Sequence, residues 1–115
     1  MVVCVPVTDD GLIEQRWGRA HRAAVAIVTD AGIAGWEEFS VGWGNLHDAD
    51  GEGEHHARIA SFLREHGTEA VVAGHMGPPM AHMLAKMRIE VHLGATGDAR
   101  DAIRRALSDE RSVGA

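Results

Sequence analysis

One junction limits the folds open to this chain: a short apolar run ends at Gly74–Pro79 (Gly-His-Met-Gly-Pro-Pro), where a segment with helical periodicity begins. The run over residues 69–73 is continuous rather than alternating, which predicts a strand covered on both faces. Proline is favoured at the first helical position, so we predict a helix over residues 78–87. A strand that leads directly into a helix is typical of a sheet with parallel strands.

The remaining elements follow from similar patterns. Valine-rich runs predict strands over 1–8 and 22–29, and the turn Asp30-Ala31-Gly32 predicts a hairpin to a third strand over 33–41. Pro6 should place part of the first strand at an unpaired or bulged position. The other predicted elements are a helix over 54–66 ended by Gly67, strands over 69–73 and 89–93, and a helix over 98–107 with Asp98 as its N-cap.

This order of elements predicts an α/β fold with one mixed five-stranded sheet. The second half of the chain forms two right-handed crossovers, which place parallel strands beside the first strand. We expect the strand order 3-2-1-4-5, with strand 2 antiparallel and helices on both faces. The chain leaves strands 1 and 4 in opposite directions, so a crevice is predicted at their carboxyl ends, where ligands bind in such sheets.

Length, charge and hydropathy limit the classes of protein to which this chain can belong. The 115 residues suffice for one domain over 1–115, with a core over 2–107 and a frayed tail over 108–115. A net charge of -6 and the lack of a Lys/Arg cluster argue against nucleic-acid binding. The apolar runs are too short to span a membrane and the start lacks a signal-peptide pattern, so a cytoplasmic protein without membrane contact is expected.

The histidine and cysteine content bears on metal binding. The chain has eight histidines and one cysteine. A single cysteine excludes a four-thiolate iron-sulfur site within one chain. Cys4 lies among valines in a predicted strand, so we interpret it as a buried structural thiol. Neutral imidazole is the commonest metal ligand among side chains, which makes the histidines the candidates.

The predicted crevice gathers Thr8–Gly11, Gly74–Gly77 and Gly94–Gly97. At the start of the helix after Gly77, unpaired amides and the helix dipole favour an anion or a sulfide-rich cluster. Glycines let a ligand approach the backbone, and His75 offers a nitrogen donor. A tight turn with a solvated histidine explains this motif alone equally well.

Other candidates also have plain structural explanations. His47 lies in the Gly-, Asp- and His-rich loop 42–53, where solvation is the simpler interpretation for a single histidine. His55 and His56 are consecutive, so only one can face the crevice. Met76 precedes the helix and is placed near the site, whereas Met80, Met83 and Met87 are assigned to the core. Arg19 either reaches an anionic ligand or holds its loop through a salt bridge.

Short motifs along the chain agree in order and spacing with one known family. They are Val5-Pro6 with its Asp-Gly turn, Trp17-Gly18-Arg19-Ala20, the Asp30 turn, the His- and Gly-rich loop, Gly-x-x-Gly-Pro at Gly74 to Pro78, and Ile89-x-Val91-x-x-Gly94. From Val2 to Leu107 the chain resembles the dinitrogenase iron-molybdenum cofactor biosynthesis family. Trp17 stands where that family usually has phenylalanine.

The resemblance implies a ribonuclease H-like sheet and a binding protein rather than an enzyme. The implied cargo is an iron-sulfur or iron-molybdenum-sulfur cluster, or its precursor, held transiently during cofactor assembly or delivery. The implied partners are cofactor-assembly or acceptor proteins, and a homodimer is compatible with this role. The predicted metal ligands are His75, His47, His55 and His56, and the predicted cofactor-binding residues are Thr8, Asp9, Arg19, Gly74, Met76, Gly77, Thr96 and Gly97.

Two other functions remain open. A regulatory or scaffold domain would bind partners through the loop around Trp43 and hold no metal. An enzyme acting on a small anionic substrate at Gly74 is the least favoured, because no general base with a partner is evident. The sequence also has no Gly-x-Ser-x-Gly turn, phosphate loop or zinc deaminase motif. The Asp9-Asp10 pair alone supplies too few acids for a metal-dependent nuclease.

Overall fold

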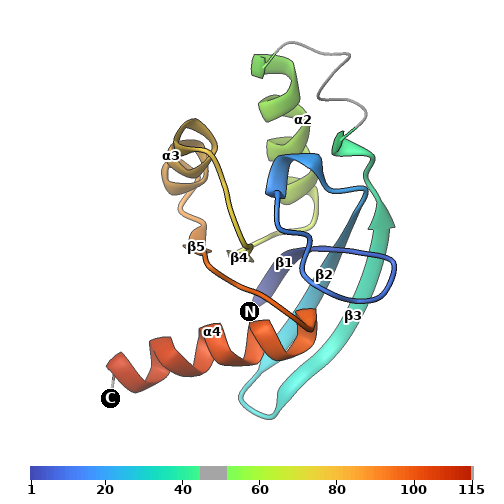
Figure 1. Cartoon of the computed structure of the whole chain (residues 1–115). Coiled ribbons are helices and arrows are strands. Elements are labelled where there is room, and N and C mark those ends of the chain that lie inside the picture. Colours follow the sequence, from blue (N-terminus) through green and yellow to red (C-terminus); the bar gives the residue numbers. More distant parts are fainter. Residues whose placement is uncertain (45–51, 115) are drawn as a thin grey trace.

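The computed structural model describes residues 1–44 and 52–114. Its elements follow the predicted order (Figure 1). They are β1 (Val2–Val7), the 3-10 turn η1 (Trp17–Arg19), β2 (Arg22–Thr29), β3 (Gly32–Ser40), α2 (Glu52–Glu65), β4 (Ala70–Val72), α3 (Pro78–Lys86), β5 (Glu90–His92) and α4 (Ala99–Gly114).

The five strands form one mixed sheet in the order β3-β2-β1-β4-β5. β2 is antiparallel to both β1 and β3, while β4 is parallel to β1 and to β5. The predicted α/β fold and its strand order are therefore confirmed. The carboxyl ends of β1, β4 and β5 share one edge of the sheet, as the parallel pairing requires.

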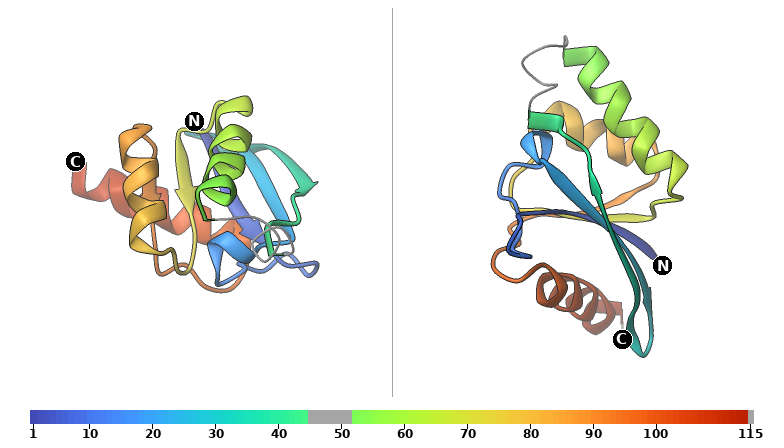
Figure 2. Two further views of the ribbon diagram at one scale, coloured as in Figure 1. Left: turned by 90° about the horizontal axis from the view of Figure 1, so that it is seen from above. Right: turned by 90° about the vertical axis from the view of Figure 1, so that its right-hand side faces the viewer.

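Helices cover both faces of the sheet, as predicted. α2 and α3 lie on one face and α4 on the other (Figure 2). Side chains of β1 alternate between the two faces: Cys4 packs on the α2 and α3 side, whereas Val3, Val5 and Val7 pack against α4. The sheet is thus buried on both sides, which accounts for its continuous apolar runs.

Several local predictions are confirmed. The Asp98 carboxylate accepts a hydrogen bond from the Asp101 amide at 3.0 Å, which makes Asp98 the N-cap of α4. Gly67 has a φ of 63° after α2, and the following Thr68 amide donates to the Leu63 carbonyl at 3.0 Å. The prediction for Pro6 holds on one side only: Pro6 pairs with Ala23 of β2 without a bulge, but it lies beyond the pairing of β1 with β4, which covers Val3 and Cys4.

The largest difference from the predicted elements is at the C-terminal end. α4 was expected to end at Leu107 but continues to Gly114. That boundary prediction is wrong. Ser108–Gly114 has no apolar periodicity from which a helix could be predicted, but its polar residues are compatible with helical backbone, so the helix continues. No helix within residues 1–44 and 52–114 is both long and apolar enough to cross a bilayer.

Candidate functional site

Three loops meet at the carboxyl edge of the sheet, and we call them the rim (residues 8–16, 73–77 and 93–98). The Gly94 amide donates to the Gly74 carbonyl at 2.9 Å, and the Ala95 amide to the Ala73 carbonyl at 3.1 Å. The Ile13 amide donates to the Gly97 carbonyl at 2.8 Å. The predicted gathering of these three segments is therefore present, held by main-chain hydrogen bonds.

The segment 11–16 runs across this edge, and we call it the crossing segment. The Ala99 amide donates to the Gly11 carbonyl at 3.0 Å, which attaches one end of the segment to the start of α4. At the other end, the His75 amide donates to the Gln15 carbonyl at 2.8 Å, and the Trp17 amide donates to the His75 carbonyl at 3.1 Å. The backbone of His75 is thus fixed on both sides by the crossing segment and η1.

The start of α3 offers fewer amides than the sequence suggested. Gly77 is the N-cap, and Pro78 and Pro79 occupy the first two helical positions. Proline has no N–H, so of the four amide positions at this helix start only Gly77 and Met80 carry a donor. The expected convergence of amides is correspondingly reduced, while the helix dipole still directs positive potential at the loop.

His75 and Met76 point to different environments. The His75 side chain is exposed at the rim. Met76 is only 6% exposed and belongs to the core cluster that contains Cys4, Trp17 and Met80. The structure therefore gives Met76 a packing role beneath the rim, and the cofactor contact expected from its place before the helix stays a prediction.

The other candidate histidines do not gather around His75. His55 is 2% exposed and lies under η1, with its Nε2 atom 3.3 Å from the position a Cβ on Gly18 would take. His56 is half-buried, with its ring centroid 6.2 Å from that of His55. His47 lies outside the described residues. Among the described side chains, no three of His, Cys, Asp or Glu come together as a group that could hold a metal ion.

The remaining predicted binding residues lie on or beside the rim. The Thr8 hydroxyl accepts a hydrogen bond from the Leu12 amide at 3.2 Å, which closes the turn after β1. Asp9 and Gly97 are exposed, and the Thr96 carbonyl accepts a hydrogen bond from Arg105 Nη2 at 2.8 Å. Arg19 is half-buried in η1. Their shared location is consistent with a binding edge, and their individual roles stay predictions.

The one thiol of the chain is unsuited to metal binding. Cys4 is fully buried in β1, and this burial raises the pKa of its thiol well above the usual range. A buried thiol that stays protonated is a poor metal ligand. Any metal-sulfur cargo at the rim would therefore have to be held without a cysteine ligand from this chain.

The scaffold hypothesis places partner binding on the loop around Trp43, and residues 45–51 of that loop lie outside the described residues. The Trp43 ring itself is buried. The side chain is 1% exposed and packs on Trp17, with ring centroids 5.0 Å apart, and on Phe62, with centroids 5.6 Å apart. Large aromatic side chains gain most from burial, which explains this inward position. Trp43 is a core residue, so a docking site centred on its ring is ruled out.

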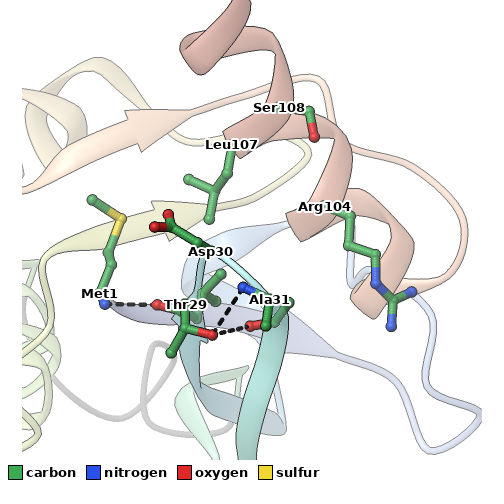
Figure 3. Close-up of a pocket in the computed structure, with 9 residues that line it drawn as sticks. Met1, Thr29, Asp30, Ala31, Arg104, Leu107 and Ser108 are labelled. Carbon is green, nitrogen blue, oxygen red and sulfur yellow. Dashed lines mark hydrogen bonds between the residues drawn. The ribbon is translucent and has the colours of Figure 1, made fainter.

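His75 lines neither of two cavities in the structure. One of about 850 Å³ opens between the β2–β3 turn and α4, and its lining includes Met1, Asp30, Arg104 and Leu107 (Figure 3). It sits at the end of the sheet opposite the rim, and no predicted site residue lines it. The second, of about 310 Å³, lies beside α4 and includes Thr96 and Arg105 in its lining.

Sequence reasoning missed Gln15. Its side chain lies across the junction, with Nε2 donating to the Ala95 carbonyl at 3.3 Å. Its Oε1 atom is 2.6 Å from the position that a Cβ on Gly74 would occupy. A glutamine in an irregular stretch gives no sequence signal of such a contact, because the contact depends on how segments distant in the chain meet.

Comparison with known proteins decides the family. The model of the family described as dinitrogenase iron-molybdenum cofactor matches residues 1–109. The chain belongs to this family. The family description relates its members to the iron-molybdenum cofactor. A comparison with curated proteins finds no match.

Solved structures show the same fold. The chain is similar to the apo form of the orange protein from Desulfovibrio gigas, with 24% identity, a TM-score of 0.74, and coverage of 94% of this chain and 88% of that chain. It is also similar to a protein designated PH0822, with 19% identity, a TM-score of 0.72, and coverage of 90% and 87%. At these identities the likeness concerns the fold alone.

Proposed function

We propose that this protein is a non-enzymatic carrier of an iron-sulfur or iron-molybdenum-sulfur cluster during cofactor assembly or delivery. The observation that carries the proposal is the placement of His75: an exposed imidazole, on a backbone fixed from both sides, at the switch point of the sheet. Family membership supports this choice of cargo. The proposed partners are proteins that build or accept the cluster, in the cytoplasm.

The chemistry of the rim suits a cargo that is held weakly and handed on. His75 supplies one nitrogen donor, and Gly74 and Gly77 leave the backbone open to close approach. The Cys4 thiol is buried and protonated, so no thiolate anchors the cluster strongly. Shallow binding through few contacts favours transfer over permanent residence.

The charge near His75 is consistent with an anionic cargo. The exposed Arg16 pairs with His75 through a backbone bridge, and α3 directs the positive end of its dipole toward the same loop. Metal-sulfur clusters with sulfide ligands are commonly anionic, so these positive potentials would attract them. We propose His75 as the principal ligand, with His47, His55 and His56 as secondary candidates.

The test is anaerobic reconstitution of the purified chain with ferrous iron and sulfide. Wild-type protein should gain visible absorbance and bound iron, and His75→Ala should lose most of both. His82→Ala is the matched control, because His82 is another exposed histidine, on α3 rather than on the rim. Equal iron content in His75→Ala and wild type would remove His75 from the proposal, and no uptake by wild type would refute the carrier function.

A further inference from the structure

We propose that the Gln15 side chain is a displaceable cover over the Gly74 backbone, which the cargo must push aside to bind. This inference rests on the proposed function. It assigns a role to a residue of the crossing segment that neither the sequence motifs nor the family resemblance singled out.

The geometry shows a side chain that bridges two loops of the rim. The Gln15 carboxamide donates through Nε2 to the Ala95 carbonyl at 3.3 Å. On its other side, Oε1 lies 2.6 Å from the position a Cβ on Gly74 would take. Only glycine leaves room for the carboxamide there, so Gln15 occupies the space over Gly74 that a ligand would need.

The side chain is held far less firmly than the backbone beneath it. Gln15 is exposed, and its hydrogen bond of 3.3 Å is at the long end of the range, so water competes for it. The Gln15 carbonyl, in contrast, accepts the His75 amide at 2.8 Å, and the neighbouring Glu14 amide donates to the Pro6 carbonyl at 3.0 Å. The carboxamide can therefore swing away while the crossing segment stays in place.

A displaceable cover has two effects on a carrier. In the empty state it satisfies the Ala95 carbonyl and shields the Gly74 backbone. When cargo binds, the Gln15 side chain must be displaced. The apparent affinity for the cargo is lowered by the factor that corresponds to the free energy of this displacement. Both effects favour release to an acceptor, so Gln15 would tune how tightly the cluster is held.

The test compares Gln15→Ala with wild type, each reconstituted with ferrous iron and sulfide and then titrated with an iron chelator. Gln15→Ala should need about two- to tenfold more chelator to lose half of its iron, since a typical net hydrogen bond corresponds to about that factor. Leu12→Ala is the matched control, because it shortens another exposed side chain of the crossing segment and should behave as wild type.

A second measurement needs no cargo. In the apo protein, Gln15→Ala should shift the backbone amide resonances of Gly74 and Ala95 while leaving those of α4 unchanged.

A third variant does need the cargo. Gly74→Ala should reduce iron loading, because its methyl group would permanently fill the space over the backbone that the cargo needs, 3.0 Å from the Gln15 carbonyl oxygen. Loading of Gly74→Ala equal to that of wild type would contradict the placement of the cargo over Gly74.

The outcomes separate the two proposals. If wild-type protein takes up no iron, the carrier function fails. If wild type loads normally but Gln15→Ala matches it in chelator resistance, the cover is refuted while the carrier function stands. Unchanged amide resonances of Gly74 and Ala95 in apo Gln15→Ala would likewise refute the cover.

Discussion

The two cores on either side of the sheet differ in composition. The aromatic core lies under α2 and α3 and contains Trp17, Trp43, Ile59, Leu63, Met76, Met80 and Leu84, with Phe62 packed against it. The aliphatic core lies under α4 and contains Val3, Val5, Val7, Ala24, Ala99, Ala102 and Ile103. Among the described residues, buried rings and thioethers occur on the first side only, whereas on the second side the buried side chains are aliphatic and the one ring, Trp36, is only partly buried.

This difference indicates that the two cores have different roles in supporting the candidate site. Two residues of the aromatic core adjoin His75: Met76 follows it in the chain, and the Trp17 amide donates a hydrogen bond to the His75 carbonyl. Packing in this core therefore directly supports the backbone of the proposed ligand. The aliphatic core has smaller side chains and reaches the rim through Ile13 and Ala95. We therefore expect mutations in the aromatic core to affect both stability and the candidate site, and those under α4 to affect mainly stability.

Trp43→Ala should have the largest effect. Removing a fully buried indole leaves a cavity, and such changes cost about 3–5 kcal/mol in the free energy of unfolding. Because Trp43 packs on Trp17, the amide resonance of His75 should also shift. Denaturant unfolding and NMR spectra measure the two effects. A large loss of stability with no change at His75 would break the proposed link between this core and the site.

Ile103→Ala should destabilise the protein by a similar or smaller amount. Truncating a fully buried isoleucine costs about 2–5 kcal/mol. The amide resonance of His75 and the uptake of iron should stay as in wild type at temperatures where the variant is folded. A change at His75 comparable to that in Trp43→Ala would show that the two cores are not separate in function.

Glu38→Gln should have the smallest effect and should depend on pH. Glu38 accepts hydrogen bonds from Trp36 Nε1 at 2.9 Å and from Arg22 Nε at 3.3 Å, and these partners, Trp36 first, lower the pKa of its carboxyl. A carboxylate with a lowered folded-state pKa stabilises the fold at neutral pH, and this contribution is lost as pH falls through that pKa. The group is largely exposed, so the loss should be about 0.5 kcal/mol or less.

The pH dependence provides its own check. The difference in unfolding free energy between Glu38→Gln and wild type should be present at pH 7 and should shrink in acid, where both side chains are neutral. Denaturant unfolding at several pH values measures it. A difference that grows on acidification would contradict the sign derived from the lowered pKa.

The sequence predicted the fold well because the elements are marked by strong local signals. Gly67 and Asp98 set helix ends, the Asp30 turn set the hairpin, and the continuous apolar runs identified the strands buried on both faces. The end of α4 was missed because no apolar pattern continues past Leu107. Strand order followed from handedness rules that hold for almost all crossovers.

The candidate site was less predictable, for reasons that particular residues illustrate. His55 lies four residues before Ile59 and eight before Leu63, a spacing that places all three on the buried face of α2. The helical pattern therefore indicates its inward position, whereas the residue type alone suggests a metal ligand. Gln15 had no such signal, because its contact with Gly74 joins segments far apart in the chain. The rim itself was located correctly through topology, whereas side-chain orientations depended on packing.

The close pair formed by Trp17 and Trp43 has an optical consequence. The chain contains no tyrosine and three tryptophans, so its near-ultraviolet emission comes from indole rings alone. Two of these rings lie 5.0 Å apart in the core beneath the rim. A metal-sulfur chromophore that absorbs at the indole emission wavelengths would quench this fluorescence by energy transfer. Binding and release of the proposed cargo would then be measurable as a decrease and a recovery of the intrinsic tryptophan fluorescence.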